Sequence, residues 1–371
     1  MVPGLGARTA NRLLDRYRTP RAVFRASRSE LESCGISGSL AQSIASGCAF
    51  DDAAAQQKKL AACAATLVPI TDQRYPARLR EIFDPPPVLF ARGRLELLGT
   101  VMIGIVGTRR PTPYGVAAAE RLSADLGRAG LTVASGMARG IDSAAHRAAL
   151  GAECNTVAVL GCGVDVVYPA ENRRMAAQIA EKGLLVSEFP MGAPAYPQNF
   201  PIRNRVISGM SVGVIVVEGA QYSGSAITAR LALDQGREVF AVPGSIMSKM
   251  SWGPNLLIKQ GAKLVQDAND VLVELRADVR RELALLTQRG LFEPPAAETA
   301  DEPPASNELN TANSAALRVL GQLQIETATP IDDLLEKIDD MTSSEVIAAL
   351  FELEMAGAVR QLPGKNFVKV W

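Results

Sequence analysis

The sequence predicts an α/β protein built around a doubly wound parallel sheet, with a helical domain before the sheet and a third domain after it. Three observations predict this organisation. From residue 67 onward, short β-branched apolar runs alternate with stretches of helical periodicity, which is typical of parallel strands joined by helices. The first 65 residues hold short helical stretches separated by glycine turns, and a proline-rich acidic stretch lies near residue 300. With 371 residues and 47% hydrophobic content, the chain is long enough for two or three domains.

Residues 1–65 are predicted to form a small helical domain that contains two similar units. Pro3-Gly4-Leu5-Gly6 precedes one amphipathic run, and Cys34-Gly35-Ile36-Ser37-Gly38 precedes another. This pattern resembles a tandem helix-hairpin-helix or sterile-alpha-motif-like module, in which glycine turns let backbone N–H groups approach a phosphate. The domain also carries seven arginines: Arg8, Arg12, Arg16, Arg18, Arg21, Arg25 and Arg28. They favour contact with DNA, and a solvated basic face on a small bundle is the alternative interpretation.

Residues 66–275 are predicted to form the doubly wound sheet. The expected strands are Val101–Gly107, Leu131–Ala134, Thr156–Leu160, Leu184–Ser187, Val212–Val217 and Val239–Val242. The expected helices cover residues 114–128, 141–150, 170–182, 202–210 and 224–235. In such a sheet the ligand lies at the carboxyl ends of the strands, so we expect the function to reside in the loops that follow them.

Residues 276–311 are predicted to be a linker, and residues 312–371 a separate domain. Pro294, Pro295, Pro303 and Pro304, with Ala, Glu and Asp between them, make a stretch of low hydrophobicity. Beyond it, three segments have the pattern of helices, namely residues 313–323, 330–337 and 343–356. Ala358–Gln361 and Phe367–Val370 have the pattern of a β-hairpin. This order resembles a winged helix.

The charge is divided along the chain in a way that the net charge of zero hides. Residues 1–275 hold seven more basic than acidic side chains, and residues 276–371 hold seven more acidic than basic ones. The division indicates a basic working surface and an acidic appendage with a different role. The third predicted helix of the tail carries Glu345, Glu352 and Glu354 and no Lys or Arg. We therefore expect this domain not to bind DNA, but to contact protein or to compete with DNA for the basic surface.

Composition argues against several classes of protein. A single histidine, His146, leaves no imidazole cluster for zinc or for a proton relay, and we expect it to be a packed or capping residue. The five cysteines form no C-x-x-C pair, which indicates reduced thiols and the cytoplasm. No apolar run reaches about 18 residues and no charged-then-apolar leader opens the chain, so we expect a soluble cytoplasmic protein without membrane contact. We expect no metal, no cofactor and no catalytic residue.

The turn after the first central strand carries the first group of candidate binding residues. It offers a glycine for close approach, a hydroxyl, two guanidinium groups and an aromatic ring: Gly107, Thr108, Arg109, Arg110 and Tyr114. This set suits a phosphodiester with a base beside it. It is not the G-x-G-x-x-G fingerprint, so the sequence disfavours a nicotinamide dinucleotide. A solvated arginine turn is the alternative interpretation.

Three further segments repeat this chemistry. The turn after the second strand offers Ser135, Gly136, Arg139 and Gly140. Residues 199–205 combine an aromatic ring with polar and basic groups, namely Phe200, Arg203, Asn204 and Arg205. Ser223, Gly224 and Ser225 open a later helix and supply hydroxyls and backbone amides for an anion. We predict one channel for a single strand, in which charge holds the backbone and a ring stacks on a base. Its members are Arg109, Arg139, Phe200 and Arg205.

Six segments, in this order, resemble the DNA-processing protein A (DprA/Smf) family: GTRRPTPYG, SGMARGIDSAAHRAAL, VAVLGCGVDVVYPAEN, NFPIRNRVISG, SGSAITARLAL and VPGSI. They span nearly the whole sheet domain. The resemblance implies an extended Rossmann-like domain that binds and protects single-stranded DNA without catalysis and forms a homodimer through that domain. It further implies loading of the RecA recombinase onto DNA that arrives by natural transformation. Helical apolarity suggests the dimer region, around Leu256, Leu257 and Ile258.

The same resemblance implies roles for individual residues. The Gly-Ser-Arg turn of the family falls on Gly107, Thr108 and Arg109, where threonine keeps the hydroxyl, and the family's tyrosine falls on Tyr114. Phe200 is implied as a stacking ring. Arg203 and Arg205 are implied to lie near phosphate or in the scaffold, and Asn204 to bind or only to cap.

Two departures from the family pattern bear on affinity. Some members carry lysines at places where this chain has Ala170 and Pro197-Gln198. Arg173 and Arg174 lie one turn further along the helix and are candidates to compensate. We expect a shallower salt dependence, because for single strands the slope is about −0.7 per phosphate neutralised.

A nucleotide-processing enzyme is the alternative function. The lysine-decarboxylase-like phosphoribohydrolases have a similar sheet and a Pro-Gly-Gly-x-Gly-Thr-x-x-Glu run. The corresponding loop here is Ser223-Gly224-Ser225-Ala226-Ile227-Thr228, without the Gly-Gly pair and without the closing Glu that would stabilise an oxocarbenium ion. The sequence therefore favours the binding protein over the enzyme.

Overall fold

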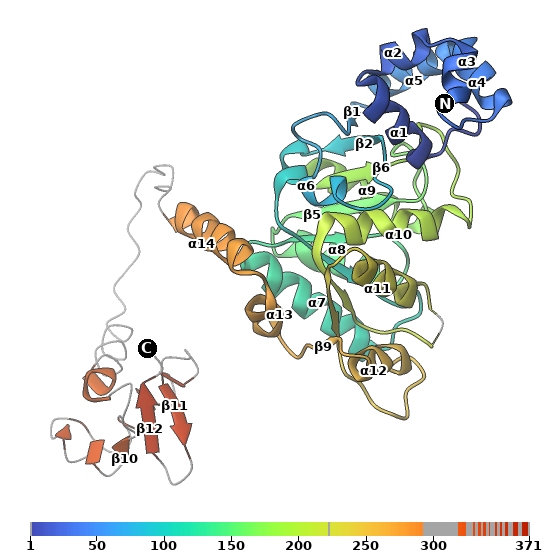
Figure 1. The fold of residues 1–371 in the computed structure, drawn as a ribbon. Helices are drawn as coiled ribbons and strands as arrows, with labels where there is room; N and C mark the ends of the chain where they lie inside the picture. The colour runs from blue at the N-terminus through green and yellow to red at the C-terminus, as the bar shows by residue number, and fades with distance from the viewer. Residues whose placement is uncertain are drawn as a thin grey trace, which may run out of the picture. The chain divides into compact units, whose positions relative to one another are not determined.

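The structure of the chain is a computed structural model that describes residues 2–221 and 223–291 and parts of the C-terminal region. The described C-terminal residues are 318–323, 329–330, 333–334, 337–338, 341, 346, 349–350, 353–354, 359–362 and 366–369. The chain divides into two compact units, residues 1–294 and residues 295–371. The first unit holds a helical module and a large sheet (Figure 1).

The helical module consists of short helices, several of which are capped by the residue that precedes them. They are α1 (Ala7–Tyr17), α2 (Pro20–Arg25), α3 (Arg28–Ser33), α4 (Gly38–Ala45) and α5 (Phe50–Ala62). The side chains of Thr19, Ser27 and Ser37 accept backbone N–H bonds at the starts of α2, α3 and α4. Leu13 and Leu31 belong to a core that the module builds for itself. The predicted helical front of the chain is therefore present.

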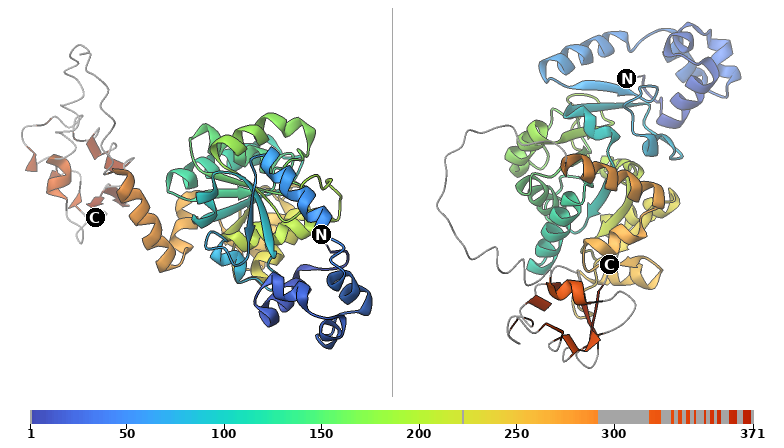
Figure 2. Two further views of the ribbon diagram at one scale, coloured as in Figure 1. Left: turned by 90° about the horizontal axis from the view of Figure 1, so that it is seen from above. Right: turned by 90° about the vertical axis from the view of Figure 1, so that its left-hand side faces the viewer.

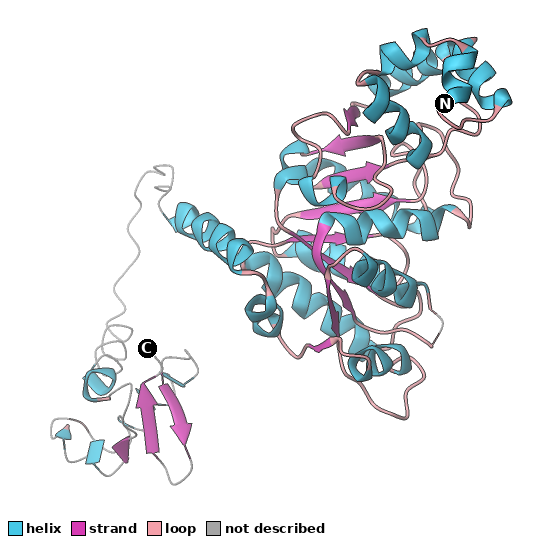
Figure 3. Ribbon diagram, in the orientation of Figure 1, coloured by secondary structure: helices cyan, strands magenta, loops and turns pink. Residues whose placement is uncertain are grey.

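Among the described residues of the first unit, nine strands form one sheet in the order β1-β2-β6-β5-β4-β3-β7-β8-β9 (Figure 3). They are β1 (Thr66–Pro69), β2 (Val88–Gly93), β3 (Met102–Val106), β4 (Thr132–Ser135), β5 (Thr156–Leu160), β6 (Leu184–Ser187), β7 (Ser211–Val216), β8 (Glu238–Ala241) and β9 (Lys263–Leu264). The seven strands β6-β5-β4-β3-β7-β8-β9 run parallel to one another. β2 pairs antiparallel with both β1 and β6. The doubly wound class is confirmed, and β1, β2 and β9 extend it beyond the six predicted strands.

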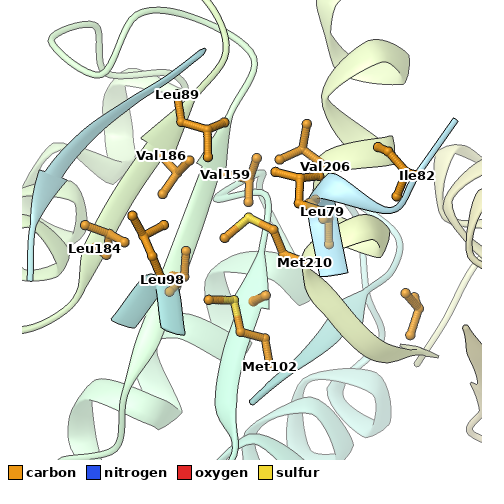
Figure 4. Close-up of a cluster of buried hydrophobic side chains, with 14 of the residues drawn as sticks. Leu79, Ile82, Leu89, Leu98, Met102, Val159, Leu184, Val186, Val206 and Met210 are labelled. Atoms are coloured by element: carbon orange, nitrogen blue, oxygen red, sulfur yellow. The ribbon is translucent and has the colours of Figure 1, made fainter. Parts of the chain in front are cut away.

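Helices cover both faces of this sheet, because successive residues of its buried strands point to opposite sides (Figure 2). They are α6 (Ala77–Arg80), α7 (Pro113–Arg128), α8 (Ile141–Gly151), α9 (Arg173–Lys182), α10 (Asn199–Met210), α11 (Gly224–Asp234), α12 (Trp252–Lys259), α13 (Ala268–Glu274) and α14 (Ala277–Leu291), with 3-10 turns at Leu95–Gly99 and Ala170–Asn172. From β3, Met102 packs with α6, α10 and α11 (Figure 4), and Ile103 packs with α7 and α8 on the other face. None of the described helices is long and apolar enough to span a bilayer.

Helix α14 occupies the first part of the segment that the sequence assigned to the linker. Val279 and Leu283 are buried and join the core on the α7 and α8 face of the sheet. Their i, i+4 spacing is the signal of an amphipathic helix, and the composition of the whole segment masked it. Residues 292–311, the rest of the predicted linker, lie outside the described residues.

The second unit contains a small antiparallel sheet among its described residues. Its strands are β10 (Thr329–Pro330), β11 (Val359–Leu362) and β12 (Asn366–Lys369), in the order β10-β12-β11. The pairing of β11 with β12 confirms the predicted hairpin. A separate core includes Val319, Leu350 and Phe367. The three predicted helices are described only in part, and Glu345 and Glu352 lie outside the described residues.

Candidate nucleic-acid interface

A crevice of about 430 Å³ opens at the carboxyl ends of the parallel strands. It lies at the switch point next to β3, where the strand order leads to β4 on one side and to β7 on the other. The turns after β3 and β4 and the first turns of α10 and α11 line it, so all four predicted segments meet. The predicted residues that line it are Gly107, Thr108, Arg109, Phe200, Arg203, Asn204, Ser223, Gly224 and Ser225. Gly136 and Arg139 line a smaller adjoining cavity of about 40 Å³.

Three side chains form a stacked cluster at this crevice. The centroids of the Phe200 and Tyr168 rings are 5.4 Å apart with an angle of 32° between the ring planes. The Arg109 guanidinium carbon lies 5.3 Å from the centroid of the Phe200 ring, within cation–π range. Tyr168 is partly exposed and was not among the predicted site residues, although it stands in the segment VAVLGCGVDVVYPAEN that carries the family resemblance. The cluster therefore places two aromatic rings and a positive charge together at the crevice.

Arg203 is a buried cation at the back of the crevice. It is only 4% exposed, and its Nη1 donates to the carbonyl oxygen of Val159 at 2.8 Å. Burial lowers the pKa of this guanidinium, and the nearby carboxylate of Asp142 acts against that shift. Asp142 in turn accepts the backbone N–H groups of Gly136 and Ala138 at 3.1 and 3.3 Å. A Cβ at position 136 would collide with the Arg203 guanidinium, which explains the glycine there.

Glu218, which follows β7, fixes the turn after β3. Its carboxylate accepts the backbone N–H of Thr112 at 2.9 Å and the Thr112 hydroxyl at 2.6 Å. Its backbone carbonyl accepts the N–H of Thr108 at 2.7 Å. Gly140 adopts a φ of 76°, and a Cβ there would collide with the Thr108 carbonyl oxygen. The turn is therefore held rigidly while the side chain of Arg109 stays exposed.

Arg205 departs from the predicted channel. Its side chain is 9% exposed and pairs with Asp84 through Nε at 3.2 Å and with Glu188 through Nη2 at 2.5 Å. It lines neither the crevice nor the adjoining cavity. At about 100° of rotation per residue along an α-helix, it points about 140° away from Phe200. Of the two roles implied for Arg205, the structure supports the scaffold.

The other predicted residues outside the main crevice have partners of their own. Arg139 forms a two-pronged ion pair with Glu171, with both N–O distances at 2.7 Å. The Tyr114 hydroxyl donates to a backbone carbonyl that follows β8, at 2.7 Å. Ser135 is buried and donates to a carbonyl oxygen of β3 at 2.6 Å. Arg110 is exposed and does not line the crevice.

The start of α11 supplies the polar side of the crevice opposite the rings. The hydroxyl oxygens of Ser223 and Ser225 are 2.7 Å apart and share a hydrogen bond. The Asn204 side-chain amide is 3.5 Å from the carbonyl oxygen of Gly224, a long contact that joins α10 to α11. Tyr222, which precedes these residues, lies outside the described residues.

His146 lies on α8, away from this crevice. It is fully buried, and its Nδ1 is 2.7 Å from the Thr156 hydroxyl oxygen. Burial lowers the pKa of the imidazole to about 3. It is a packed residue, as the sequence predicts. In the parts of the chain that the structure describes, no three His, Cys, Asp or Glu side chains are grouped so that they could hold a metal ion.

Comparison with known proteins assigns the family. The family model for DNA recombination-mediator protein A matches residues 66–276, and the model for the DprA winged helix domain matches residues 294–365. The chain belongs to the DprA family. Protein Smf of Escherichia coli (strain K12) is 39% identical over 299 residues, which cover 80% of this chain and 76% of that protein. DNA processing protein DprA of Bacillus subtilis (strain 168) is 47% identical over 209 residues, 56% of this chain and 70% of that protein.

Two solved structures of DprA proteins share the fold. The X-ray structure of DprA from Streptococcus pneumoniae has a TM-score of 0.63 and 33% sequence identity, and covers 73% of this chain and 99% of that one. The structure of DprA from Helicobacter pylori has a TM-score of 0.51 and 28% identity, and covers 61% of this chain and 96% of that one. The latter protein is described as having a unique single-stranded DNA binding mode. The predicted DprA resemblance, the Rossmann-like sheet and the winged helix are thereby confirmed.

Proposed function

We propose that this member of the DprA family binds single-stranded DNA in the crevice at the carboxyl ends of β3, β4, β5 and β7, without catalysing a reaction. The observation that carries the proposal is the stacked cluster of Arg109, Phe200 and Tyr168. Aromatic rings that accept the face of any base, next to guanidinium groups that hold the backbone, are the combination that single strands require. The single-stranded DNA binding described for the Helicobacter pylori relative supports it.

Each part of the crevice then has a role. Phe200 stacks on a base, and Arg109 contacts the adjacent phosphate. The start of α11, with Ser223 and Gly224, supplies hydroxyl and backbone N–H groups for a second phosphate. Arg203 contributes positive charge from behind and needs no direct contact. Because none of these contacts recognises a base edge, we expect little sequence preference.

The non-catalytic character is supported by how the buried carboxylates near the crevice are used. Asp142 accepts two backbone N–H groups, and Glu218 accepts the N–H and hydroxyl of Thr112. A carboxylate that stabilises an oxocarbenium ion must face the sugar, whereas both of these are held by the protein's own turns. A phosphoribohydrolase would release free base from a nucleoside monophosphate, and we expect no such release.

We further propose that the protein acts in the cytoplasm on DNA that enters by natural transformation, protects it and loads RecA onto it. The family membership supports this role. The test is a salt series of oligonucleotide binding, with single-stranded and double-stranded DNA, in the presence and absence of RecA. We expect preference for the single strand, a slope of about −0.7 per phosphate held, and faster assembly of RecA on strands that carry the protein. Equal binding of duplex, or slower assembly of RecA, would contradict the respective part of the proposal.

We propose that the homodimer forms through the α11 and α12 side of the sheet domain. The residues Leu256 to Ile258, suggested by the sequence, are half-buried, and Leu257 packs against the protein's own core. Exposed apolar side chains occur instead at the end of α11, where Leu233 is 60% exposed, and in the loop between β8 and α12, where Ile246 is 92% and Met247 87% exposed. The adjacent pair Ile246 and Met247 favours a protein contact in this loop. Ile246→Lys should convert the dimer to a monomer in analytical ultracentrifugation, and an unchanged sedimentation coefficient would place the dimer surface elsewhere.

A further inference from the structure

A second, larger groove of about 1140 Å³ lies where the helical module meets the sheet domain. Residues of helix α1 line one side, and residues of the segment from 70 to 85, which runs from the end of β1 past α6, line the other. Figure 1 shows α1 and β1 in the ribbon. The groove shares no lining residue with the crevice at the strand ends. It is therefore a separate surface that the proposed function does not use.

The two walls of this groove are fixed to one another. The side-chain amide of Asn11 donates to the carbonyl oxygen of Pro85 at 2.8 Å. On the sheet side of α5, the side chain of Gln56 exchanges two hydrogen bonds with the backbone of Met191, at 3.1 and 2.8 Å. Leu60 of α5 also packs into a cluster with side chains of the sheet domain. The groove is thus preformed and needs no closure to bind a ligand.

The groove repeats the chemistry of the crevice with different residues. The Arg8 guanidinium carbon lies 4.4 Å from the centroid of the Phe83 ring. Phe83 is 80% exposed, so a flat group can stack on it. Arg12 and Arg18 also line the groove and are exposed. The ion pairs between described residues include none of these three arginines, which leaves their charges available to a ligand.

The two acids in the groove differ in their effect on an anionic ligand. Asp72 is held by Arg74, with N–O distances of 2.6 and 3.0 Å, and this contact lowers the pKa of Asp72 to about 2. Its charge is therefore balanced within the protein. Asp15 lines the groove and is exposed, and the ion pairs between described residues do not include it. Removing the charge of Asp15 therefore tests whether the ligand is an anion.

We infer that this groove binds a second stretch of the single DNA strand that the crevice holds. The inference rests on the proposed function. Three arginines suit a phosphate backbone, and an exposed ring suits an unstacked base, whereas bases in a duplex are covered by their neighbours. Helix α10 connects the two surfaces. Phe200 is in its first turn, and Arg205, further along, pairs with Asp84, the residue after Phe83.

The first experiment separates the groove from the crevice by strand length. The full-length protein and its variants are titrated with labelled oligonucleotides of about 5 and about 25 nucleotides, near the lower end and beyond the upper end of the about 4–16 nucleotides of common single-strand sites. Phe83→Ala should weaken binding of the long strand at least about fivefold and leave the short strand unchanged, while Phe83→Tyr, which keeps the ring, should behave as the parent. Phe200→Ala should weaken both. The variants touch an exposed ring and are checked for folding by thermal unfolding.

The outcomes distinguish the two proposals. If Phe83→Ala binds the long strand as tightly as the parent, the groove is not part of the DNA path, whatever Phe200→Ala does. If Phe200→Ala binds both strands as the parent does while Phe83→Ala does not, the groove stands and the crevice proposal fails. A groove that holds duplex as tightly as a single strand, measured by competition with a double-stranded oligonucleotide, would also overturn the inference.

The second experiment uses a gain of affinity, which misfolding cannot produce. Asp15→Asn removes a negative charge from the groove and should tighten binding of the long strand about two- to fivefold. Asp51→Asn makes the same change of net charge on α5, outside the groove lining, and should have no such effect. Equal effects of the two variants would contradict a local site. Arg8→Ala should reduce the salt slope by about 0.7, whereas Arg16→Ala, on α1 but outside the lining, should not.

Discussion

Replacing Phe200 by alanine removes the ring at the centre of the stacked cluster. The ring lies 5.4 Å from that of Tyr168 and 5.3 Å from the Arg109 guanidinium, centroid to centroid and centroid to Cζ. A base stacked on an aromatic side chain contributes about 1–3 kcal/mol by alanine substitution. At about 1.4 kcal/mol for each factor of ten, the Kd for a single-stranded oligonucleotide should rise between about fivefold and about 150-fold.

Fluorescence anisotropy with a labelled oligonucleotide measures this change. Phe200→Leu keeps an apolar side chain but no ring and should lose nearly as much affinity as Phe200→Ala. Ile202→Ala is the matched control, because Ile202 is an exposed neighbour on α10 that does not line the crevice. Phe200 is half-buried, so we expect a loss of stability below the about 3–5 kcal/mol of a fully buried phenylalanine, and thermal unfolding checks it. A folded Phe200→Ala protein that binds as tightly as the parent would refute the crevice as the DNA site.

Three further predictions concern charged residues of the sheet domain. Glu171→Gln releases Arg139 from its ion pair, so the affinity for DNA should rise and the slope of log K against log salt should steepen by about 0.7. A salt titration measures both, and a weaker complex would show that Arg139 does not face DNA. Arg205→Ala leaves the largely buried Glu188 and the partly exposed Asp84 unpaired and should lower the free energy of unfolding by about 3 kcal/mol in urea titrations, while the Kd of the folded protein stays near that of the parent. Burial raises the pKa of Glu188 to about 7 from an ordinary value of 4.5, so the native state holds this proton more tightly than the unfolded chain does. The free energy of unfolding should therefore fall by up to about 3 kcal/mol between about pH 4.5 and pH 7.5, and Glu188→Gln should flatten this slope; an unchanged slope would assign it to other groups.

The central strands were predictable because they are buried on both faces, which gives continuous apolar runs such as Thr156–Leu160 and Val212–Val217. The edge of the sheet was not. β9 consists of two exposed residues, Lys263 and Leu264, and is too short to give a strand pattern in the sequence. β1 and β2 pair antiparallel next to proline-rich turns, and no alternation of apolar residues identifies them as strands. Helix α14 was not predicted because residues 276–311 were assessed by their average composition. That average does not show that Val279 and Leu283 are apolar and one helical turn apart.

The sequence predicted which turns form the site, but not which side chains of those turns point into it. Parallel strands bring their carboxyl ends to one edge, so the turns of Thr108 and Ala138 had to be neighbours. Arg203 and Arg205 stand in one motif, and their roles depend on whether Asp142 or Glu188 packs against them, which only the folded chain shows. Helical rotation alone would have separated Arg205 from Phe200. No sequence signal placed the ring of Tyr168 beside that of Phe200.

Helix α10 is one uninterrupted helix with Phe200 in its first turn and, at Arg205, an ion pair to the residue after Phe83. This ion pair therefore links the helix that carries Phe200 to the loop that carries Phe83. A strand that reaches both surfaces gains from the second at a high effective concentration, whereas a fragment too short to reach gains nothing. Two linked surfaces of this kind would distinguish strands by their length. If both surfaces bind DNA as proposed, the protein should retain strands long enough to reach both and release shorter fragments.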